Sequence, residues 1–141
     1  MPRLVLDTSI IVSALRSKTG ASNAILRLIA ARALTPLATP ALFLEYEEVL
    51  KRPEQRLAHG LGLNEIDQFL SALASACEPV ETRFQWRPQL SDPDDEMVLE
   101  AALNGRADAI VTHNIKDFKI APERFRLRVL TPRDLLKERR S

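Results

Sequence analysis

Apolar residues follow two spacings along this chain, and together these spacings predict strands that alternate with helices. Short, mostly apolar runs predict strands at 3–6, 36–38, 108–112 and 126–130. Apolar residues three or four positions apart predict helices at 9–16, 22–33, 39–52, 54–60, 64–76 and 92–104, a short turn or helix at 114–118, and a last helix from residue 131. Residues 78–91, which include Pro79 and Pro88, are expected to be irregular.

This order of elements predicts the fold class. Strands that alternate with helices form parallel sheets with helices on both faces, and the crossovers between such strands are right-handed. We therefore expect one α/β domain over residues 1–141, built as a three-layer α/β/α sandwich around a central, mostly parallel sheet.

The composition narrows the class of protein. Hydrophobic residues make up 45% of the chain, which excludes a disordered protein. A single cysteine, Cys77, cannot form a disulfide within the chain, which favours a reducing compartment. The sequence has no apolar run of about 18 residues and no signal-peptide pattern. We therefore expect a cytoplasmic protein without a membrane association.

Charge is unevenly distributed, although the formal net charge is only +1. Residues 1–32 carry five basic residues and one acid, residues 33–115 carry six and fourteen, and residues 116–141 carry nine and four. Basic ends around an acidic middle suit a site where acids bind metal and basic residues contact phosphate. A mixed-sign surface with no partner would look the same, so charge alone does not decide.

Two predicted strands end in polar residues. Asp7 follows the first strand, and Thr112, His113 and Asn114 end or follow the strand at 108–112. In an open parallel sheet, ligands bind beyond the carboxyl ends of the strands. A carboxylate at that position is a good metal ligand, but Asp7 is equally suited to cap the next helix, and the sequence leaves both roles open.

The predicted helix at 39–52 supplies further acids. Glu45 and Glu47 flank its apolar stripe, whereas Glu48 points nearly opposite. Either of the first two could lean toward the strand ends, and periodicity does not choose between them.

The predicted helix at 92–104 begins with an acidic run. Asp92 suits the N-cap and Pro93 the first helical position, so capping explains part of the run. Asp95, however, shares a helix face with apolar residues, where a carboxylate is costly unless a cation or donor meets it. Hard cations such as Mg²⁺ and Mn²⁺ prefer oxygen ligands, and converging carboxylates from distant positions are typical of two-metal phosphodiester hydrolysis.

The histidines, the cysteine and the tryptophan do not form a recognisable site. The spacing of His59 and His113 matches no zinc site, and we expect both to be ordinary surface or core residues. We expect Cys77 to pack as a small apolar residue, and Trp86 to fold over the core edge rather than stack on a base.

Taken together, these fragments resemble the PIN domain, particularly the branch related to the VapC toxins. The resemblance covers nearly the whole chain and keeps the family's order. It rests on the strand tip at 4–9, the Glu-containing segment at 45–52, the segment at 92–95 followed by Ala101, Ala102 and Gly105, and the strand tip at 109–114 followed by Asp117 and Phe118.

The resemblance implies a set of carboxylate ligands for Mg²⁺ or Mn²⁺. It implies that Asp7, Glu45 and Asp95 are the catalytic metal ligands, with Asp92 as an alternative or supporting ligand. Ser9 stands where the family usually has asparagine, and its hydroxyl can still orient Asp7.

The chain departs from the family pattern after the strand at 108–112. The family usually has an acid where this chain has Asn114. The Asn114 side chain still offers a carbonyl oxygen as a metal ligand, and Asp117 is a candidate for the missing charge.

The resemblance also implies a function and partners. It implies an endoribonuclease that hydrolyses RNA phosphodiester bonds, acts as the toxin of a toxin–antitoxin pair, binds a small antitoxin and forms a homodimer. We expect contacts with the RNA substrate from Ser9, Thr112, Lys116, Arg124 and Arg126.

Two alternatives remain at this point. The first, motivated by Asn114, is a catalytically degenerate PIN domain that binds RNA or a protein partner without cleavage. The second is a phosphatase or receiver-type α/β domain with Asp7 as nucleophile. The phosphatase pattern needs a second aspartate where Ser9 stands, and the paired acids of receivers are absent from the first strand.

Overall fold

The computed structural model describes residues 2–84 and 89–140, and within them the chain forms one five-stranded sheet. The strand order is β3-β2-β1-β4-β5, and every neighbouring pair is parallel. The strands are β1 (Arg3–Leu6), β2 (Thr35–Ala38), β3 (Glu78–Pro79), β4 (Ala109–Val111) and β5 (Arg128–Leu130). This arrangement confirms the expected α/β sandwich, with a sheet that is parallel throughout.

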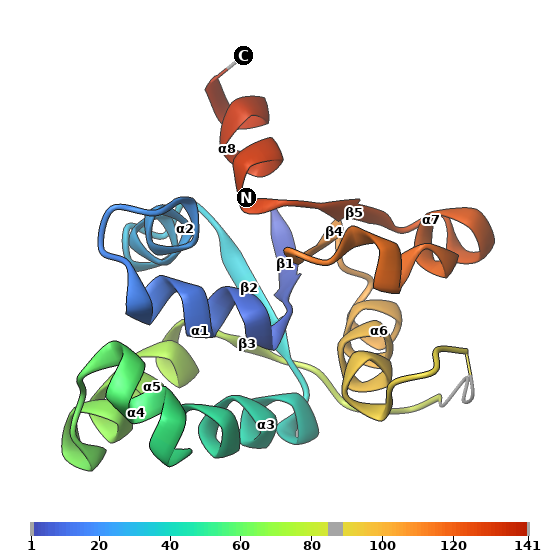
Figure 1. Ribbon diagram of the computed structural model, residues 1–141. Coiled ribbons are helices and arrows are strands. Elements are labelled where there is room, and N and C mark those ends of the chain that lie inside the picture. The colour runs from blue at the N-terminus through green and yellow to red at the C-terminus, as the bar shows by residue number, and fades with distance from the viewer. Residues whose placement is uncertain (1, 85–88, 141) are drawn as a thin grey trace.

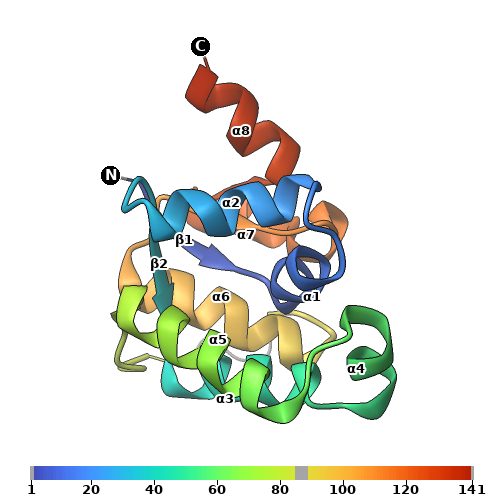
Figure 2. The ribbon, with the colours of Figure 1, turned by 90° about the vertical axis from the view of Figure 1, so that its left-hand side faces the viewer.

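Helices cover both faces of the sheet. Figure 1 shows α1 and α2 on one side of the strands and α6 on the other, while α3 contacts both α1 and α6. Figure 2 shows that α8 extends away from the rest of the molecule. The helices are α1 (Thr8–Arg16), α2 (Ala21–Ala30), α3 (Pro40–Leu50), α4 (Pro53–His59), α5 (Leu63–Ala76), α6 (Pro93–Gly105), the 3₁₀ helix η1 (Ile115–Phe118), α7 (Ile120–Phe125) and α8 (Pro132–Arg140).

Local sequence explains where the two central helices begin. The Thr39 side chain accepts a hydrogen bond from the Leu42 amide at the start of α3, and the Asp92 side chain accepts one from the Asp94 amide at the start of α6. A proline follows each of these caps, where its missing N–H costs no helical hydrogen bond.

Two elements were not expected from the sequence. The prediction of irregular structure over 78–91 was wrong at β3, which holds its place because it pairs with β2 and the Val80 amide continues the ladder to the Ala38 carbonyl. Helix α7, which contains Pro122 in its first turn, was also missed. Trp86, for which we predicted a position over the core edge, lies outside the described residues.

The core lies between the sheet and its helices. Large, fully buried side chains come from the strands and from both helical layers, among them Leu6, Ile10, Leu42, Leu99 and Phe118. Gly105, at the end of α6, lies so close to the sheet layer that a Cβ atom would stand 2.9 Å from Val80 Cγ2 and 3.1 Å from Leu37 Cδ1. Within the described residues, no helix is long and apolar enough to span a membrane.

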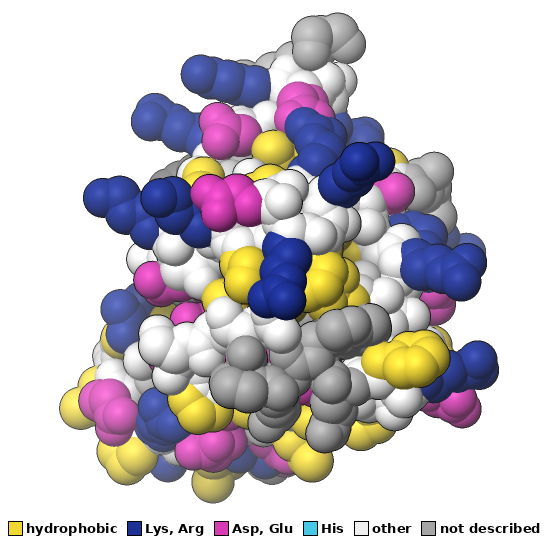
Figure 3. Space-filling view, turned by 90° about the vertical axis from the view of Figure 1, so that its right-hand side faces the viewer, with side chains coloured by type: hydrophobic (Ala, Val, Ile, Leu, Met, Phe, Trp, Pro, Cys, Tyr) yellow, Lys and Arg dark blue, Asp and Glu magenta, His cyan; other side chains and the backbone are white. Residues whose placement is uncertain are grey.

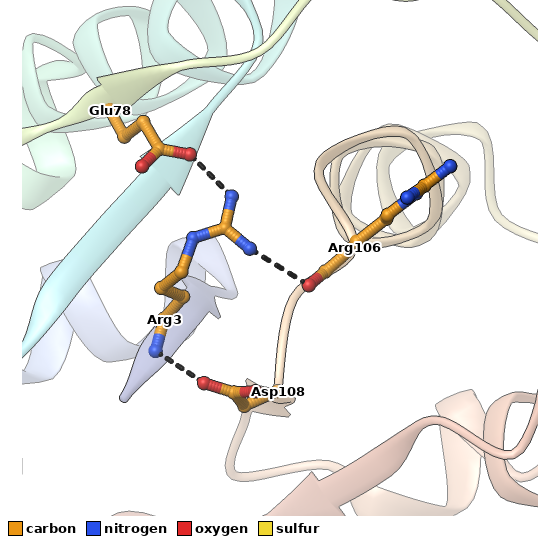
Figure 4. A network of polar contacts seen from close by, with 4 residues as sticks. All are labelled: Arg3, Glu78, Arg106 and Asp108. Atoms are coloured by element: carbon orange, nitrogen blue, oxygen red, sulfur yellow. Dashed lines mark hydrogen bonds and ion pairs between the residues drawn. The ribbon is translucent and has the colours of Figure 1, made fainter. Parts of the chain in front are cut away.

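A polar network closes the sheet at the amino ends of its strands (Figure 4). The Arg3 amide donates to Asp108 Oδ2 at 2.7 Å, and its guanidinium donates to the Arg106 carbonyl at 3.0 Å and to the Glu78 carboxylate. These contacts join β1 to β3 and to the connection between α6 and β4. The candidate site lies at the opposite ends of the strands, which are their carboxyl ends.

Candidate metal centre at the carboxyl edge of the sheet

Asp7 is held in place as the chain leaves β1. Its amide donates to the Val111 carbonyl at 2.9 Å, which continues the pairing of β1 with β4. Its Oδ2 accepts hydrogen bonds from Ser9 Oγ at 2.8 Å and from Thr112 Oγ1 at 2.7 Å. Asp7 occupies the N-cap position of α1, but its side chain makes no capping hydrogen bond. Of the two roles left open by the sequence, the structure therefore does not support capping.

The carboxylate of Asp7 is fixed through one oxygen and open through the other. The side chain is only 7% exposed, and both hydroxyl donors act on Oδ2. Oδ1 accepts no hydrogen bond from any residue in the described part of the chain. A fixed carboxylate with one uncommitted oxygen has the form of a metal ligand that its neighbours orient.

Thr112 directly follows β4 and is fully buried. Its hydroxyl donates to Asp7 and accepts from the Asn114 amide at 3.0 Å, so it shapes the turn that follows the strand. The hydroxyls of Ser9 and Thr112 both donate to Asp7, and the contact with substrate that the sequence suggests for these two residues stays a prediction.

Asp95 lies in the first turn of α6, half-buried among other acids. Burial raises the pKa of its carboxyl to about 7, with further increases from the carboxylates of Asp7, Asp92, Asp117 and Asp94. Asp7 and Asp95, which are 88 positions apart in the chain, therefore interact electrostatically in the folded protein. Repulsion of this kind is what a bound cation would relieve.

Glu45 faces the same region from α3, and its side chain is only 8% exposed. Burial raises the pKa of its carboxyl, and so do the carboxylates of Asp94 and Glu48. Glu47, the other acid that the sequence allowed, forms a surface ion pair with Lys51 at 3.0 Å. The packing of α3 against α6 thus places Glu45, rather than Glu47, beside the start of α6.

Asn114 and Asp117 lie at the exposed margin of the centre. The Asn114 side chain makes no capping hydrogen bond to η1, although the residue occupies its N-cap position. Asp117, within η1, is close enough for its charge to raise the pKa of Asp95. Asn114 thus lies in the turn after β4 with Thr112, and Asp117 lies in the 3₁₀ helix that follows this turn.

The donor chemistry suits a hard divalent cation, but the side chains are spread apart. Among residues 2–84 and 89–140, no three His, Cys, Asp or Glu side chains lie close enough together to bind one ion. Carboxylates that no cation neutralises repel one another, and this repulsion keeps their side chains apart. The carboxylate and amide oxygens of these residues therefore fit such a cation in their chemistry.

Two acids of α6 are buried, which the sequence did not predict. Glu96 is 3% exposed, and its Oε1 accepts hydrogen bonds from the Gln89 and Leu90 amides at 2.5 and 2.7 Å. Glu100, one turn further along, is 5% exposed. Glu96, Glu100 and Asn104 are spaced four residues apart, and this helical spacing is the pattern that could have indicated a shared polar face. The Asn104 side chain accepts hydrogen bonds from the Arg83 and Phe84 amides. Glu96 thus holds the segment that leads into the acidic start of α6, whereas Asn104 holds residues 83 and 84 at the other end of the helix.

His113 also has a more specific position than we expected from the sequence. Its Nε2 lies 2.9 Å from Ser13 Oγ and 3.1 Å from Ser22 Oγ. The contacts join three segments that are far apart in the chain, so no local pattern could have indicated them.

The basic residues proposed for substrate lie on η1 and around α7. Lys116, Arg124 and Arg126 are all exposed, and Arg124 donates to Gln89 Oε1 at 2.7 Å. Figure 3, which views the molecule from the α6 and α7 side of Figure 1, shows Lys and Arg side chains spread over the upper half of this face, with acids between them. The surface is therefore of mixed charge with a basic excess toward the C-terminal segment.

Comparison with known proteins places these features in a family. A solved structure with a similar fold is VapBC2 from Rickettsia felis, bound to a DNA fragment from its promoter. The alignment has a TM-score of 0.62 and 18% sequence identity, and covers 92% of this chain and 98% of that chain. No curated protein matches the sequence with significant similarity. The family model described as "PIN domain" matches residues 3–116, which is well over half of the sequence. The chain therefore belongs to the PIN domain family.

Proposed function

We propose that the chain is an endoribonuclease that depends on Mg²⁺ or Mn²⁺ and acts as the toxin of a toxin–antitoxin pair. The observation that carries the proposal is that acids from four segments of the chain influence one another electrostatically at the carboxyl ends of the strands. Asp7 and Asp117 raise the pKa of Asp95, and Glu45 faces the same helix start from α3. A cation bound there would supply the charge that polarises a water molecule and a phosphate oxygen.

Other residues of the chain would orient the metal ligand and attract the RNA. Ser9 and Thr112 orient the Asp7 carboxylate, which leaves its other oxygen for a ligand. Lys116, Arg124 and Arg126 lie on the segments that follow β4, where their charges would attract the RNA backbone. We expect product strands that end in a 5′-phosphate and a 3′-hydroxyl.

The test is RNA cleavage by the purified protein with single-stranded and structured RNAs, in Mn²⁺ and in EDTA. We expect cleavage in Mn²⁺ alone, and its loss in Asp7→Asn. Asp67→Asn is the matched control, because Asp67 is an exposed acid of α5 paired with Lys51 on the surface. Metal-dependent cleavage that persists in Asp7→Asn at wild-type rate would refute the proposal.

A second candidate is a degenerate PIN domain that binds RNA without cutting it. Asn114 in place of an acid supports this alternative, as does the spread of the carboxylates. Titration calorimetry with Mn²⁺ separates the two candidates, because the enzyme requires saturable binding that Asp7→Asn weakens. The absence of such binding, together with retained RNA binding, would favour the degenerate domain.

We also propose a small antitoxin-type protein as partner and a homodimer as the assembled form. The similarity to a chain of the VapBC2 structure supports the first, since that structure contains both proteins of such a pair. Co-purification of a short protein encoded beside this one tests the partner, and light scattering of the purified chain tests the dimer.

A further inference from the structure

We infer that His113 is a positioning residue of the candidate metal centre, because its ring holds the turn after β4 against α1 and α2. The inference rests on the proposed function, since the position of this turn matters for cleavage only if Asp7 binds the metal. Neither the family match nor the sequence spacing assigns a role to this side chain.

Two serine side chains, one from α1 and one from α2, meet at the His113 ring in the turn after β4. His113 Nε2 lies 2.9 Å from Ser13 Oγ of α1 and 3.1 Å from Ser22 Oγ in the first turn of α2. The two serine oxygens are themselves 2.6 Å apart, and Ser22 is buried. A ring nitrogen can accept from a hydroxyl or donate to one, so the cluster can be satisfied in either tautomer.

The cluster stands beside the contact that orients Asp7. Asp7 precedes α1, which carries Ser13, and Thr112 directly precedes His113. Two side-chain contacts therefore join the segment that follows β1 to the turn that follows β4, one between Asp7 and Thr112 and one between Ser13 and His113. The amide hydrogen bonds of Asp7 to Val111 and of Thr112 to Leu130 fix where the turn begins, and the Ser13 contact fixes its continuation at His113.

Packing alone does not explain the placement of His113. The side chain is exposed, so it buries little apolar surface and adds little to the core. Its polar contacts reach inward to α1 and α2, and the turn that it anchors also carries Asn114 and leads to Asp117. Loss of the ring should therefore disturb the arrangement of the centre more than the stability of the fold.

The chain provides a matched control in His59. Its Nε2 lies 3.1 Å from the Leu50 carbonyl, and its Nδ1 accepts from the Leu61 amide at 3.0 Å. This ring also ties neighbouring segments together with two hydrogen bonds, but it does so at the end of α4 and through Leu50 and Leu61, not through Asp7 or Thr112. A purely structural effect of losing a bonded histidine should thus be reproduced by His59→Leu.

The experiment compares His113→Leu, His113→Gln and His59→Leu with the wild type. The first measurement is solvent exchange of the Asn114 amide by NMR in metal-free protein, since this amide bonds to Thr112 Oγ1. The second is the affinity for Mn²⁺ alone by calorimetry. We expect His113→Leu to speed the exchange and to weaken Mn²⁺ binding about tenfold, the usual scale for a residue that orients a ligand. Glutamine can replace both serine contacts, so His113→Gln should restore both values, and His59→Leu should change neither.

Two outcomes would overturn the inference. Exchange of the Asn114 amide at the wild-type rate in His113→Leu would show that the ring does not hold the turn. Equal Mn²⁺ affinity in His113→Leu and in the wild type would show that the held turn does not position the ligands. A wild-type protein that neither binds Mn²⁺ nor cleaves RNA contradicts the proposed function itself. The exchange measurement then still decides whether the His113 ring holds the turn after β4.

Discussion

The hydroxyl of Thr112 donates a 2.7 Å hydrogen bond to Oδ2 of Asp7, across the pairing of β4 with β1. The two residues are 105 positions apart in the chain, yet each comes at the carboxyl end of a central strand. Parallel pairing of those strands brings the two ends together, so the sheet itself orients the acid that we propose as the first metal ligand.

Thr112→Val should therefore weaken metal binding more than it weakens the fold. Valine keeps the shape of the buried side chain but removes the donor to Asp7 and the acceptor for the Asn114 amide. We expect a loss of about 1 kcal/mol in the free energy of unfolding and about tenfold weaker Mn²⁺ binding. Thr35→Val, at the amino end of β2, is the control and should leave Mn²⁺ affinity unchanged. Calorimetry that finds the two variants equal would contradict this role for Thr112.

That Asp7 and Thr112 lie together could be predicted from the sequence, because it depends on local patterns. A polar residue that ends an apolar run marks a strand tip, and parallel topology places Asp7 and Thr112 at the same edge. The choice between Glu45 and Glu47 could not be made, because both flank the same stripe of one helix. Only the packing of α3 on α6, and the pairing of Glu47 with Lys51, distinguish them.

Features that depend on partners far away in the chain could not be predicted from the sequence. Strand β3 has two residues, one of them proline, and exists because β2 offers a free edge beside it. The contacts of His113 with Ser13 and Ser22 span 100 and 91 positions, so no window of sequence contains them. Periodicity reports which face of an element is buried, but not which side chains of other elements meet it.

Asp95→Asn should stabilise the metal-free protein at neutral and higher pH. The folded state raises the pKa of Asp95 from 3.8 to about 7, so it holds a proton that the unfolded chain releases. Stability is therefore lost as pH rises from about 4 through 7, and asparagine removes that loss. A shift of this size corresponds to at most about 4 kcal/mol, and screening by solvent reduces it to about 1–2 kcal/mol for a half-exposed side chain.

Urea unfolding in EDTA at pH 5 and pH 8 measures this effect. The free energy of unfolding of Asp95→Asn should exceed that of the wild type by more at pH 8 than at pH 5. Added Mn²⁺ should reduce this difference, because it binds and stabilises the wild type. Glu54→Gln, in the first turn of α4, controls for the loss of an acid near a helix N-terminus, because Glu54 does not act on Asp95. An equal advantage at both pH values would mean that Asp95 is not repelled by its neighbours.

Gly105→Ala should destabilise the fold although alanine favours helices. The new Cβ would stand 2.9 Å from Val80 Cγ2 and 3.1 Å from Leu37 Cδ1, and both of those side chains are buried and cannot move aside freely. We expect a loss of about 1–3 kcal/mol by overpacking. Gly62→Ala, whose Cβ would meet only the flexible Glu65 side chain at 3.6 Å, should change little. Thermal unfolding of both variants checks the prediction, which fails if Gly105→Ala unfolds at or above the wild-type temperature.

Tyr46→Phe should affect the metal centre through the backbone rather than through a ligand. The buried Tyr46 hydroxyl donates to the carbonyl of Leu6, the residue before Asp7. The registered pairs of β2 with β1 are at Arg3 and Leu4, so beyond them the hydroxyl supplies a partner for the Leu6 carbonyl. The same hydrogen bond ties α3, which carries Glu45, to the strand that carries Asp7.

Loss of this hydroxyl should lower the free energy of unfolding by about 1–2 kcal/mol, because the buried carbonyl loses its partner. Since two proposed ligands lose a shared anchor, we also expect Mn²⁺ affinity to fall several-fold. Phe43→Leu is the control: it removes the ring that meets Tyr46 edge-on at 6.1 Å, but leaves the hydroxyl in place. That variant should lose stability through packing while it retains Mn²⁺ affinity. If Tyr46→Phe and Phe43→Leu weaken Mn²⁺ binding to the same degree, then general loosening of α3, rather than the tie to Leu6, governs the alignment of Glu45 with Asp7.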